Sequence, residues 1–153
     1  VDLAGAEALF PTSDYEKLFA HARAEGIPFT IHAGEAAGPE SIRQAVDYGT
    51  ARIGHGVNCI HDKNLMNIIA EKGITLELCP TSNLNTKIVN DIKDYPIDKI
   101  INNKIKVTIN TDNMTVSGTD EASEMKLICD TFGYDGNMRR IFVNNAIDAA
   151  FFR

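Results

Sequence analysis

Four ionisable side chains stand where short apolar segments of this sequence give way to polar, glycine-containing loops. They are His32 and Glu35 in HAGE, His55 in GHG and Asp112 in NTDN. In barrels of parallel strands, the active site lies at the carboxyl ends of the strands, where residues far apart in the sequence converge. We therefore expect these four side chains to lie around one point at one rim of a curved sheet.

The residue types suit chemistry at a metal-bound water. A catalytic zinc ion takes histidine nitrogens and carboxylate oxygens as ligands, keeps one position open and lowers the pKa of its bound water to about 7. Glu35 stands where a loop could aim it inward, as an acid that protonates the substrate while the hydroxide adds. Gly34 and the pair Gly54 and Gly56 would let the backbone pass close to a ligand or metal.

Each of these residues also has a structural interpretation. A histidine at a strand end is often simply hydrogen-bonded there, Glu35 could cap the following helix, and Asp112 and Asn113 could cap a loop. Only the combination of HAGE, GHG and NTD favours the chemical interpretation. Ser82 and Asn83 stand in a loop that could approach a substrate, but a turn explains them equally well, so they are not included among the site residues.

The elements that position these residues follow an alternation of apolar, β-branched segments and helical stretches, which predicts an α/β fold with parallel strands. The predicted strands are 29–32, 51–54, 74–78 and 106–110, with 1–3 as the tail of an earlier strand. The predicted helices are 14–25, 39–48, 62–72 with Asp62 as N-cap, 97–102, 121–132 and 137–152. Residues 81–90 are polar and turn-rich, and we expect a loop there.

Composition excludes several classes of protein. The chain has 153 residues, 44% hydrophobic and 24% charged, which predicts one globular domain over 1–153. A net charge of -6 with 15 scattered Lys and Arg argues against a nucleic-acid partner. No apolar stretch is long enough to span a membrane, the first residues do not resemble a signal peptide, and the cysteines form no CxxC pair. We therefore expect a cytoplasmic protein.

Five segments, VDLAGAE, FTIHAGE, RIGHGV, LELCPTSN and TINTDN, closely resemble the adenosine deaminase family of the amidohydrolase superfamily. The resemblance covers essentially the whole chain, and the combination of HAGE, GHG and NTD is specific. It implies the C-terminal half of a TIM (β/α)8 barrel and one zinc ion per complete active site. It also implies a purine nucleoside as substrate, with adenosine hydrolysed to inosine and ammonia by the full-length protein.

The resemblance also implies a role for each matching residue. His32 corresponds to a zinc ligand, and Asp112 to the aspartate that binds zinc and contacts the attacking water. Glu35 corresponds to the general acid that protonates N1 of the purine. His55 corresponds to the histidine that orients or deprotonates the zinc-bound water, and Gly5 to the glycine whose backbone N–H contacts N3.

Two departures from the family pattern qualify this assignment. The family binds zinc through two further histidines in a His-x-His motif on its first strand, which this sequence lacks. We therefore expect this chain to lack about the first half of a barrel of ~250 residues or more, and to be inactive alone. Asn113 stands where many members have a second aspartate that contacts N7, and its amide NH₂ can donate to N7. The four histidines are His21, His32, His55 and His61, of which the first and last are expected at the surface or in structural positions.

Two alternatives remain open at this point. The parent protein could act on adenine or another aminopurine instead of adenosine. The chain could also be a catalytically inactive binding or assembly module, because an unclosed barrel edge leaves backbone groups unpaired and favours homo-oligomers.

Overall fold

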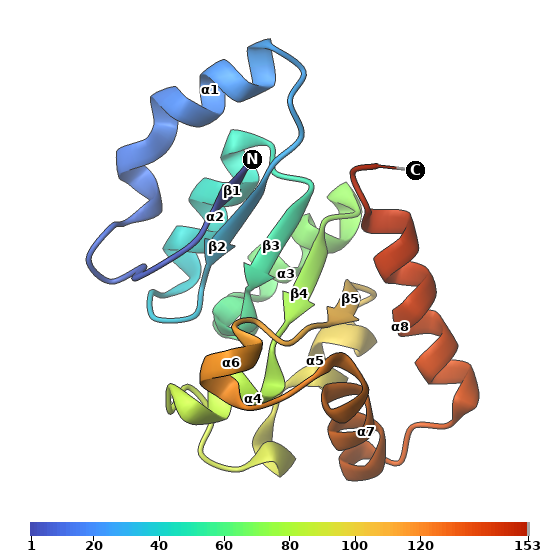
Figure 1. The fold of residues 1–153 in the computed structure, drawn as a ribbon. Helices are drawn as coiled ribbons and strands as arrows, with labels where there is room; N and C mark the ends of the chain where they lie inside the picture. Colours follow the sequence, from blue (N-terminus) through green and yellow to red (C-terminus); the bar gives the residue numbers. More distant parts are fainter. Residues whose placement is uncertain (153) are drawn as a thin grey trace.

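The predicted strands form one five-stranded parallel sheet in the computed structural model, which describes residues 1–152 (Figure 1). The strands are adjacent in sequence order, so each connection carries the chain back to the amino end of the sheet. This confirms the predicted fold class. The strands are β1 (Asp2–Leu3), β2 (Thr30–Ala33), β3 (Arg52–His55), β4 (Thr75–Leu78) and β5 (Lys106–Ile109).

The helices begin and end at residues that local sequence selects. Asp62 caps α3 by accepting a hydrogen bond from the Leu65 N–H at 3.0 Å, and Gly49 and Gly73 end α2 and α3 in the left-handed conformation. The principal helices are α1 (Glu16–Ala24), α2 (Pro39–Tyr48), α3 (Lys63–Lys72), α5 (Ile97–Asn102), α7 (Glu121–Phe132) and α8 (Gly136–Ala149).

The two faces of the sheet differ in polarity because successive strand residues point to opposite sides. A row of apolar residues is paired in register across four strands and lies in the hydrophobic core: Ile31, Ile53, Leu76 and Val107. Helices α2 and α3 lie behind the sheet in Figure 1. The next row along the same strands, on the opposite face, is His32, Gly54, Glu77 and Thr108. The polar row is the one that can face a substrate.

The structure corrects two of the predicted elements. Residues 81–90 were expected as a loop, but α4 (Pro80–Asn85) begins there, because Pro80 suits the first turn and the Asn83 N–H donates to the Cys79 carbonyl at 2.9 Å. The last helix was expected to reach residue 152, but α8 ends at Ala149. Its end is held by Arg52, whose guanidinium donates to the Ala149 carbonyl at 3.4 Å and lies 3.8 Å from the centre of the Phe151 ring.

Short helices that were not predicted occur in the connections. The predicted helix 14–25 is divided into a 3-10 turn, η1 (Thr12–Tyr15), and α1. Two further 3-10 turns, η2 (Val57–His61) and η3 (Ile92–Asp94), and the single-turn helix α6 (Met114–Ser117) follow strand ends or precede helices. The turn α6 lies directly after the NTDN motif and its N-cap is Asn113.

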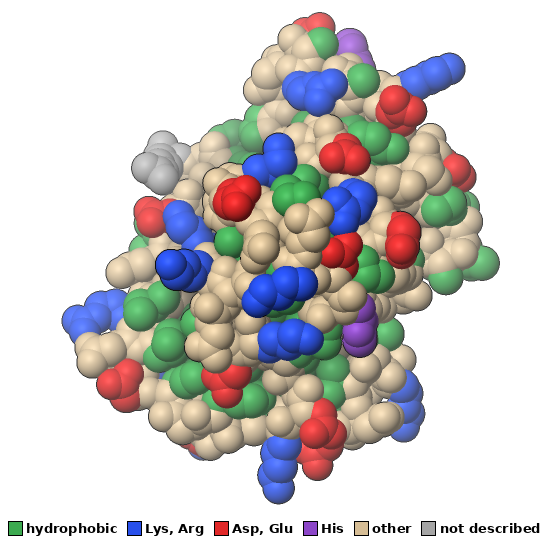
Figure 2. Space-filling model, turned by 180° about the vertical axis from the view of Figure 1, so that it is seen from behind, with side chains coloured by type: hydrophobic (Ala, Val, Ile, Leu, Met, Phe, Trp, Pro, Cys, Tyr) green, Lys and Arg blue, Asp and Glu red, His purple; other side chains and the backbone are tan. Residues whose placement is uncertain are grey.

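Acidic and basic side chains lie interspersed on the face seen from behind in Figure 2, without a continuous basic surface. None of the helices within residues 1–152 combines the length and the apolar character needed to cross a membrane.

Along β5, α8 packs against the strand, and Asn145 donates its side-chain N–H to the Val107 carbonyl at 2.9 Å. This contact satisfies one carbonyl of β5, whose other side pairs with β4.

Candidate active site

The carboxyl ends of β2 and β3 bring three of the predicted site residues into direct contact. The rings of His32 and His55 lie 4.4 Å apart between centroids. The parallel register pairs His55 with Ala33, the neighbour of His32, and His55 ends β3 with a φ of 60° that departs from strand geometry. Glu35 Oε2 lies 3.1 Å from His32 Nε2, and Glu35 Oε1 lies 3.7 Å from His55 Nδ1. The candidate ligand atoms of the three residues all lie within 4.8 Å of one another.

Asp112 lies at the same rim, beyond the end of β5. It lines a cavity of about 320 Å³ together with His32 and His55. Its Oδ2 accepts a hydrogen bond of 2.7 Å from the Ser82 hydroxyl at the start of α4. All four residues predicted from HAGE, GHG and NTD therefore meet at one end of the sheet, although they are up to 80 positions apart in the sequence.

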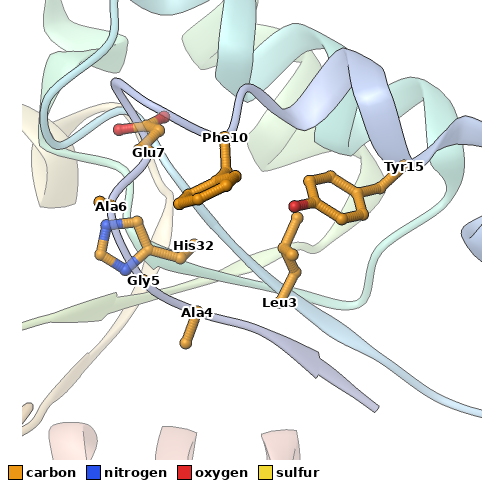
Figure 3. Close-up of a pocket in the computed structure, with 8 residues that line it drawn as sticks. All are labelled: Leu3, Ala4, Gly5, Ala6, Glu7, Phe10, Tyr15 and His32. Atoms are coloured by element: carbon orange, nitrogen blue, oxygen red, sulfur yellow. The ribbon is translucent and has the colours of Figure 1, made fainter.

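The two predicted substrate-binding residues lie on either side of this group. Gly5 follows β1 with a φ of 128° and lines a second cavity of about 160 Å³, which His32 also lines (Figure 3). Asn113 is exposed beside Asp112, and its side-chain oxygen caps α6 by accepting from the Val116 N–H at 3.0 Å. The oxygen of Asn113 is thus engaged in a structural bond, and its NH₂ is the group available for recognition.

Two of the four residues other than glycine that have a positive φ within residues 1–152 lie at this rim; the other two are Lys87 and Lys104. His55 has a φ of 60° and Asp112 a φ of 56°, in a region that residues other than glycine seldom adopt. Such conformations persist where the contacts of the surrounding structure enforce them, and they are common at functional sites. Gly34, with a φ of 73°, has no room for a side chain, since an added Cβ would lie 2.2 Å from Ile42 Cδ1. A side chain at position 34 would therefore displace Ile42 and strain the loop that carries Glu35.

Asn83, which sequence analysis left aside, is central to the site. Its Nδ2 lies 3.1 Å from both Glu35 Oε1 and His55 Nδ1, and its Oδ1 accepts from the Tyr95 hydroxyl at 3.0 Å. Asn83 and Tyr95 are buried, with exposed fractions of 0% and 2%. A reversed amide would place two acceptor oxygens against each other at Glu35, so the NH₂ group faces the site. His55 Nδ1 then accepts this hydrogen bond.

Glu7 is a second residue that sequence analysis missed. It is only 5% exposed, and its carboxylate points into the loop that follows β2. The motif segment VDLAGAE contained it, but no neighbouring pattern indicated what it would contact. Its hydrogen-bond donors are the backbone N–H groups of Gly34, Glu35, Ala36 and Ala37 and the hydroxyl of Ser41.

The charges of the three central residues depend on one another. Burial alone would lower the pKa of His32, but the close contact with Glu35 and the negative charge of Glu35 outweigh burial, so the pKa is raised. Burial alone would raise the pKa of Glu35, but hydrogen bonding to His32 and the charge of His55 leave it lowered. For His55, burial dominates and the pKa is lowered. The arrangement favours an ionised Glu35 beside a neutral His55.

The donor set suits a divalent metal such as zinc. His32 Nε2 is buried and makes no well-aligned hydrogen bond within residues 1–152, although Glu35 Oε2 is close to it. A buried nitrogen in this state is available as a metal ligand. Asp112 adds a carboxylate oxygen at the same cavity, and imidazole nitrogen with carboxylate oxygen is a common combination at catalytic zinc sites. Two protein ligands are fewer than the three such sites use.

A family model described as adenosine deaminase matches residues 1–153. This chain belongs to the adenosine deaminase family. An adenosine deaminase from Haemophilus ducreyi is 45% identical over 151 residues, which cover 99% of this chain and 44% of that protein. An adenosine deaminase from Clostridium perfringens is 39% identical over 152 residues, covering 99% and 46%. The chain therefore spans about half the length of the curated relatives it matches.

Solved structures of deaminases and amidohydrolases share the fold of this adenosine deaminase family member. A crystal structure of an adenine deaminase from Arthrobacter aurescens matches 99% of the chain and 47% of its own length, with a TM-score of 0.94 and 24% identity. An amidohydrolase from Burkholderia ambifaria, solved with bound Zn, matches 99% and 43%, with a TM-score of 0.90 and 25% identity. The five strands correspond to about half of a TIM barrel.

Proposed function

We propose that this chain is part of a zinc-dependent enzyme that hydrolyses adenosine to inosine and ammonia. It would supply the general acid Glu35, the catalytic histidine His55 and two metal ligands. The remainder of the barrel would supply further histidine ligands. The observation that carries the proposal is the convergence of His32, Glu35, His55 and Asp112 at the carboxyl ends of the strands. Identity of 45% to an adenosine deaminase supports adenosine as substrate.

Each residue would then have a defined task. His32 and Asp112 would hold a zinc ion, which when bound supplies a nucleophilic hydroxide at neutral pH. Asp112, held by the Ser82 hydroxyl, would orient the attacking water towards C6 of the purine. His55 would donate from Nε2 to the oxygen that adds to C6, because its Nδ1 accepts from Asn83. Glu35 would protonate N1 as the hydroxide adds.

Glu35 must carry a proton when it acts as the acid, whereas its pKa is lowered in this structure. Burial raises that pKa, and the close contact of Glu35 with His32 Nε2 at 3.1 Å is the largest influence that lowers it. A His32 that binds metal through Nε2 cannot also donate from Nε2 to Glu35. Metal binding by His32 would therefore remove that influence, and a purine that excludes water from the cavity would strengthen the effect of burial.

The proposed purine site lies between Gly5 and Asn113. The backbone N–H of Gly5 would contact N3 and the NH₂ of Asn113 would donate to N7, with the ring between them at the rim cavity. An amide donates to N7 at any pH, whereas a carboxyl in its place would have to be protonated. Turnover of adenosine compared with adenine in the complete enzyme would show which substrate this pair serves.

Two further expectations are kept as proposals. A cytoplasmic location agrees with three buried cysteines that form no disulfide, Cys59, Cys79 and Cys129. Association through the sheet edges at β1 and β5 would be detected by sedimentation of the 153-residue chain, where a monomer would contradict it.

The test requires a complete barrel. Either the protein's own upstream segment or the N-terminal half of the Haemophilus ducreyi relative would be joined ahead of Val1. We expect about one zinc ion per chain, ammonia release from adenosine, and loss of activity on chelation that zinc restores. A folded, zinc-loaded barrel that releases no ammonia from adenosine would contradict the proposal.

A further inference from the structure

We propose that Glu7 is the positioning residue for Glu35, because its carboxylate holds the backbone of the loop that aims the acid. This inference rests on the proposed function. It concerns a residue that neither metal nor substrate chemistry requires. Glu7 follows β1, 28 positions before Glu35, and approaches the loop from the neighbouring strand.

The contacts of the Glu7 carboxylate use both oxygens. Oε1 accepts from the Gly34 N–H at 2.6 Å and from the Ser41 hydroxyl at 2.5 Å. Oε2 accepts from three consecutive backbone N–H groups, those of Glu35 at 3.1 Å, Ala36 at 2.8 Å and Ala37 at 3.0 Å. Four successive N–H groups of the acid loop thus converge on one side chain.

The acid loop is held from its carbonyl side as well. Asn58, in η2 after β3, donates its side-chain N–H groups to the Glu35 and Ala37 carbonyls, both at 2.9 Å. Glu7 therefore binds the N–H groups and Asn58 the carbonyl groups of the same short segment. No strand pairs with this segment, so these side chains replace the hydrogen bonds that a sheet would provide.

The position of Glu7 also connects the acid to the proposed purine site. Gly5, Glu7 and His32 line the same cavity of about 160 Å³, and Figure 3 shows the three residues around it. Only one residue separates Gly5 from Glu7, so a displacement of the segment after β1 moves both the proposed N3 contact and the support of the acid loop. Purine binding and acid placement are thus tied to one short segment.

An isosteric variant separates positioning from folding. In Glu7→Gln, an NH₂ group replaces one acceptor oxygen and faces N–H donors, so the loop loses part of its support at unchanged side-chain volume. We expect kcat to fall about 10- to 100-fold, since small misplacements of catalytic groups have effects of this order. KM should change less than kcat, because the four N–H contacts of Glu7 are to the acid loop and Gly5 is affected only through the chain. Zinc content should stay near that of the wild type, because Glu7 does not touch the metal in this assignment.

Chemical rescue provides the sharper test. Glu7→Ala removes a group that has the size and charge of acetate and leaves its five donors in place. In the complete enzyme, added acetate should restore part of the lost kcat in a saturable manner. It should leave the wild type and the surface control Glu25→Ala unchanged, because Glu25 is exposed and lies outside this loop. A carboxylate too large for the vacated space, such as benzoate, should not rescue.

A readout that does not depend on catalysis is amide hydrogen exchange at Gly34, Glu35, Ala36 and Ala37. These amides should exchange slowly in the wild type, faster in Glu7→Gln, and more slowly again when acetate is added to Glu7→Ala. This measurement remains informative if the wild type does not deaminate adenosine, so failure of the proposed function can be told apart from failure of this inference. Wild-type kcat in Glu7→Gln, or loss of zinc and activity that acetate does not restore, would overturn it.

Discussion

The two ends of β2, β3 and β4 carry polar clusters that differ in how their groups are held. At the carboxyl ends, His32, Glu35 and His55 lie within a few ångströms of one another, with His55 in a left-handed conformation and His32 Nε2 without a well-aligned hydrogen bond. Towards the amino ends, the first residues of β2 and β3, Thr30 and Arg52, contact the side chain of Glu77 on β4. Glu77 Oε2 accepts from the Thr30 hydroxyl at 2.8 Å and Oε1 lies 3.2 Å from Arg52 Nε, while Glu77 also lines the cavity next to His32.

The amino-end cluster satisfies its charges internally. Arg52 is paired with Glu77, covered by the Phe151 ring and bonded to the Ala149 carbonyl, so it joins the sheet to the end of the chain. Its members use ordinary backbone conformations, whereas the carboxyl-end cluster includes His55 in a left-handed conformation. Each cluster contains one buried nitrogen without a well-aligned hydrogen bond, His32 Nε2 at the carboxyl ends and Arg52 Nε, which is ion-paired with Glu77, towards the amino ends. The comparison indicates that the carboxyl ends of these strands position groups for catalysis, whereas the contacts towards their amino ends stabilise the fold.

The largest expected effect concerns Glu35 in the cluster at the carboxyl ends of the strands. In the complete enzyme, Glu35→Gln keeps the side-chain size but removes the proton donor, so kcat should fall about 10²–10⁴-fold. Zinc content and the midpoint of urea unfolding should remain close to those of the wild type. The matched control is Glu25→Gln, an identical change at an exposed position, which should retain activity. An active Glu35→Gln enzyme would remove Glu35 from the role of acid.

A second prediction concerns the close packing of the acid loop. Gly34→Ala should destabilise the protein by about 3 kcal/mol or more, because the added methyl group overlaps Ile42 and the φ of 73° is strained for alanine. Gly73→Ala is the matched control, since Gly73 has a φ of 68° but nothing within 4 Å of an added Cβ. It should cost about 1 kcal/mol. Equal shifts of the urea midpoint in Gly34→Ala and Gly73→Ala would show that the contact with Ile42 adds nothing to the loss of stability.

Arg52→Leu tests the cluster towards the amino ends of the strands. This change leaves Glu77 without its cationic partner and removes the contact with Phe151, so we expect a loss of about 2 kcal/mol in the free energy of unfolding. The kcat of the complete enzyme should stay near that of the wild type. Arg43→Leu breaks the more exposed pair with Asp62 and should cost much less. If Arg52→Leu lowered kcat without lowering the stability, Arg52 would act in catalysis and not in stabilising the fold.

The smallest expected effect is a pH dependence of stability at Glu7. Burial raises the pKa of this carboxyl, but hydrogen bonds from Ser41, Ala37 and Gly34 outweigh it and leave the pKa below the usual 4.5. The bound carboxylate therefore stabilises the fold fully above pH 4.5, and this stabilisation is lost as the pH falls through the lowered pKa. The stability difference between wild type and Glu7→Gln should shrink in that acidic range. A difference that stays constant with pH would contradict the assignment.

Much of the scaffold could be predicted because it depends on local patterns. Helices 39–48, 97–102 and 121–132 have the predicted bounds, since periodic apolar residues and glycine stops act within a few residues. Helix α4 and the early end of α8 were mispredicted. The end of α8 depends on Arg52, which is nearly a hundred residues away in the sequence, and no local pattern records that contact.

The candidate site, like the scaffold, could be predicted only in part. His32, Glu35, His55 and Asp112 could be identified because each lies at or just after the carboxyl end of a recognisable strand, and parallel strands end at a common rim. Asn83 and Tyr95 could not, because their roles depend on the direction in which the chain turns after β4. Glu7 could not be identified either, since its partners lie 27 to 34 positions later and are mostly backbone groups that carry no sequence pattern.

By itself the amino-acid sequence determined that parallel strands would be separated by helices, and which ionisable residues would follow those strands. Periodicity, capping and glycine placement act over short distances, so they can be recognised without coordinates. Only the tertiary structure decided that Asn83 faces both Glu35 and His55, and that Glu7 gathers the N–H groups of the acid loop. Hydrogen bonds between distant segments depend on the packing of whole elements, and that packing is a property of the folded chain.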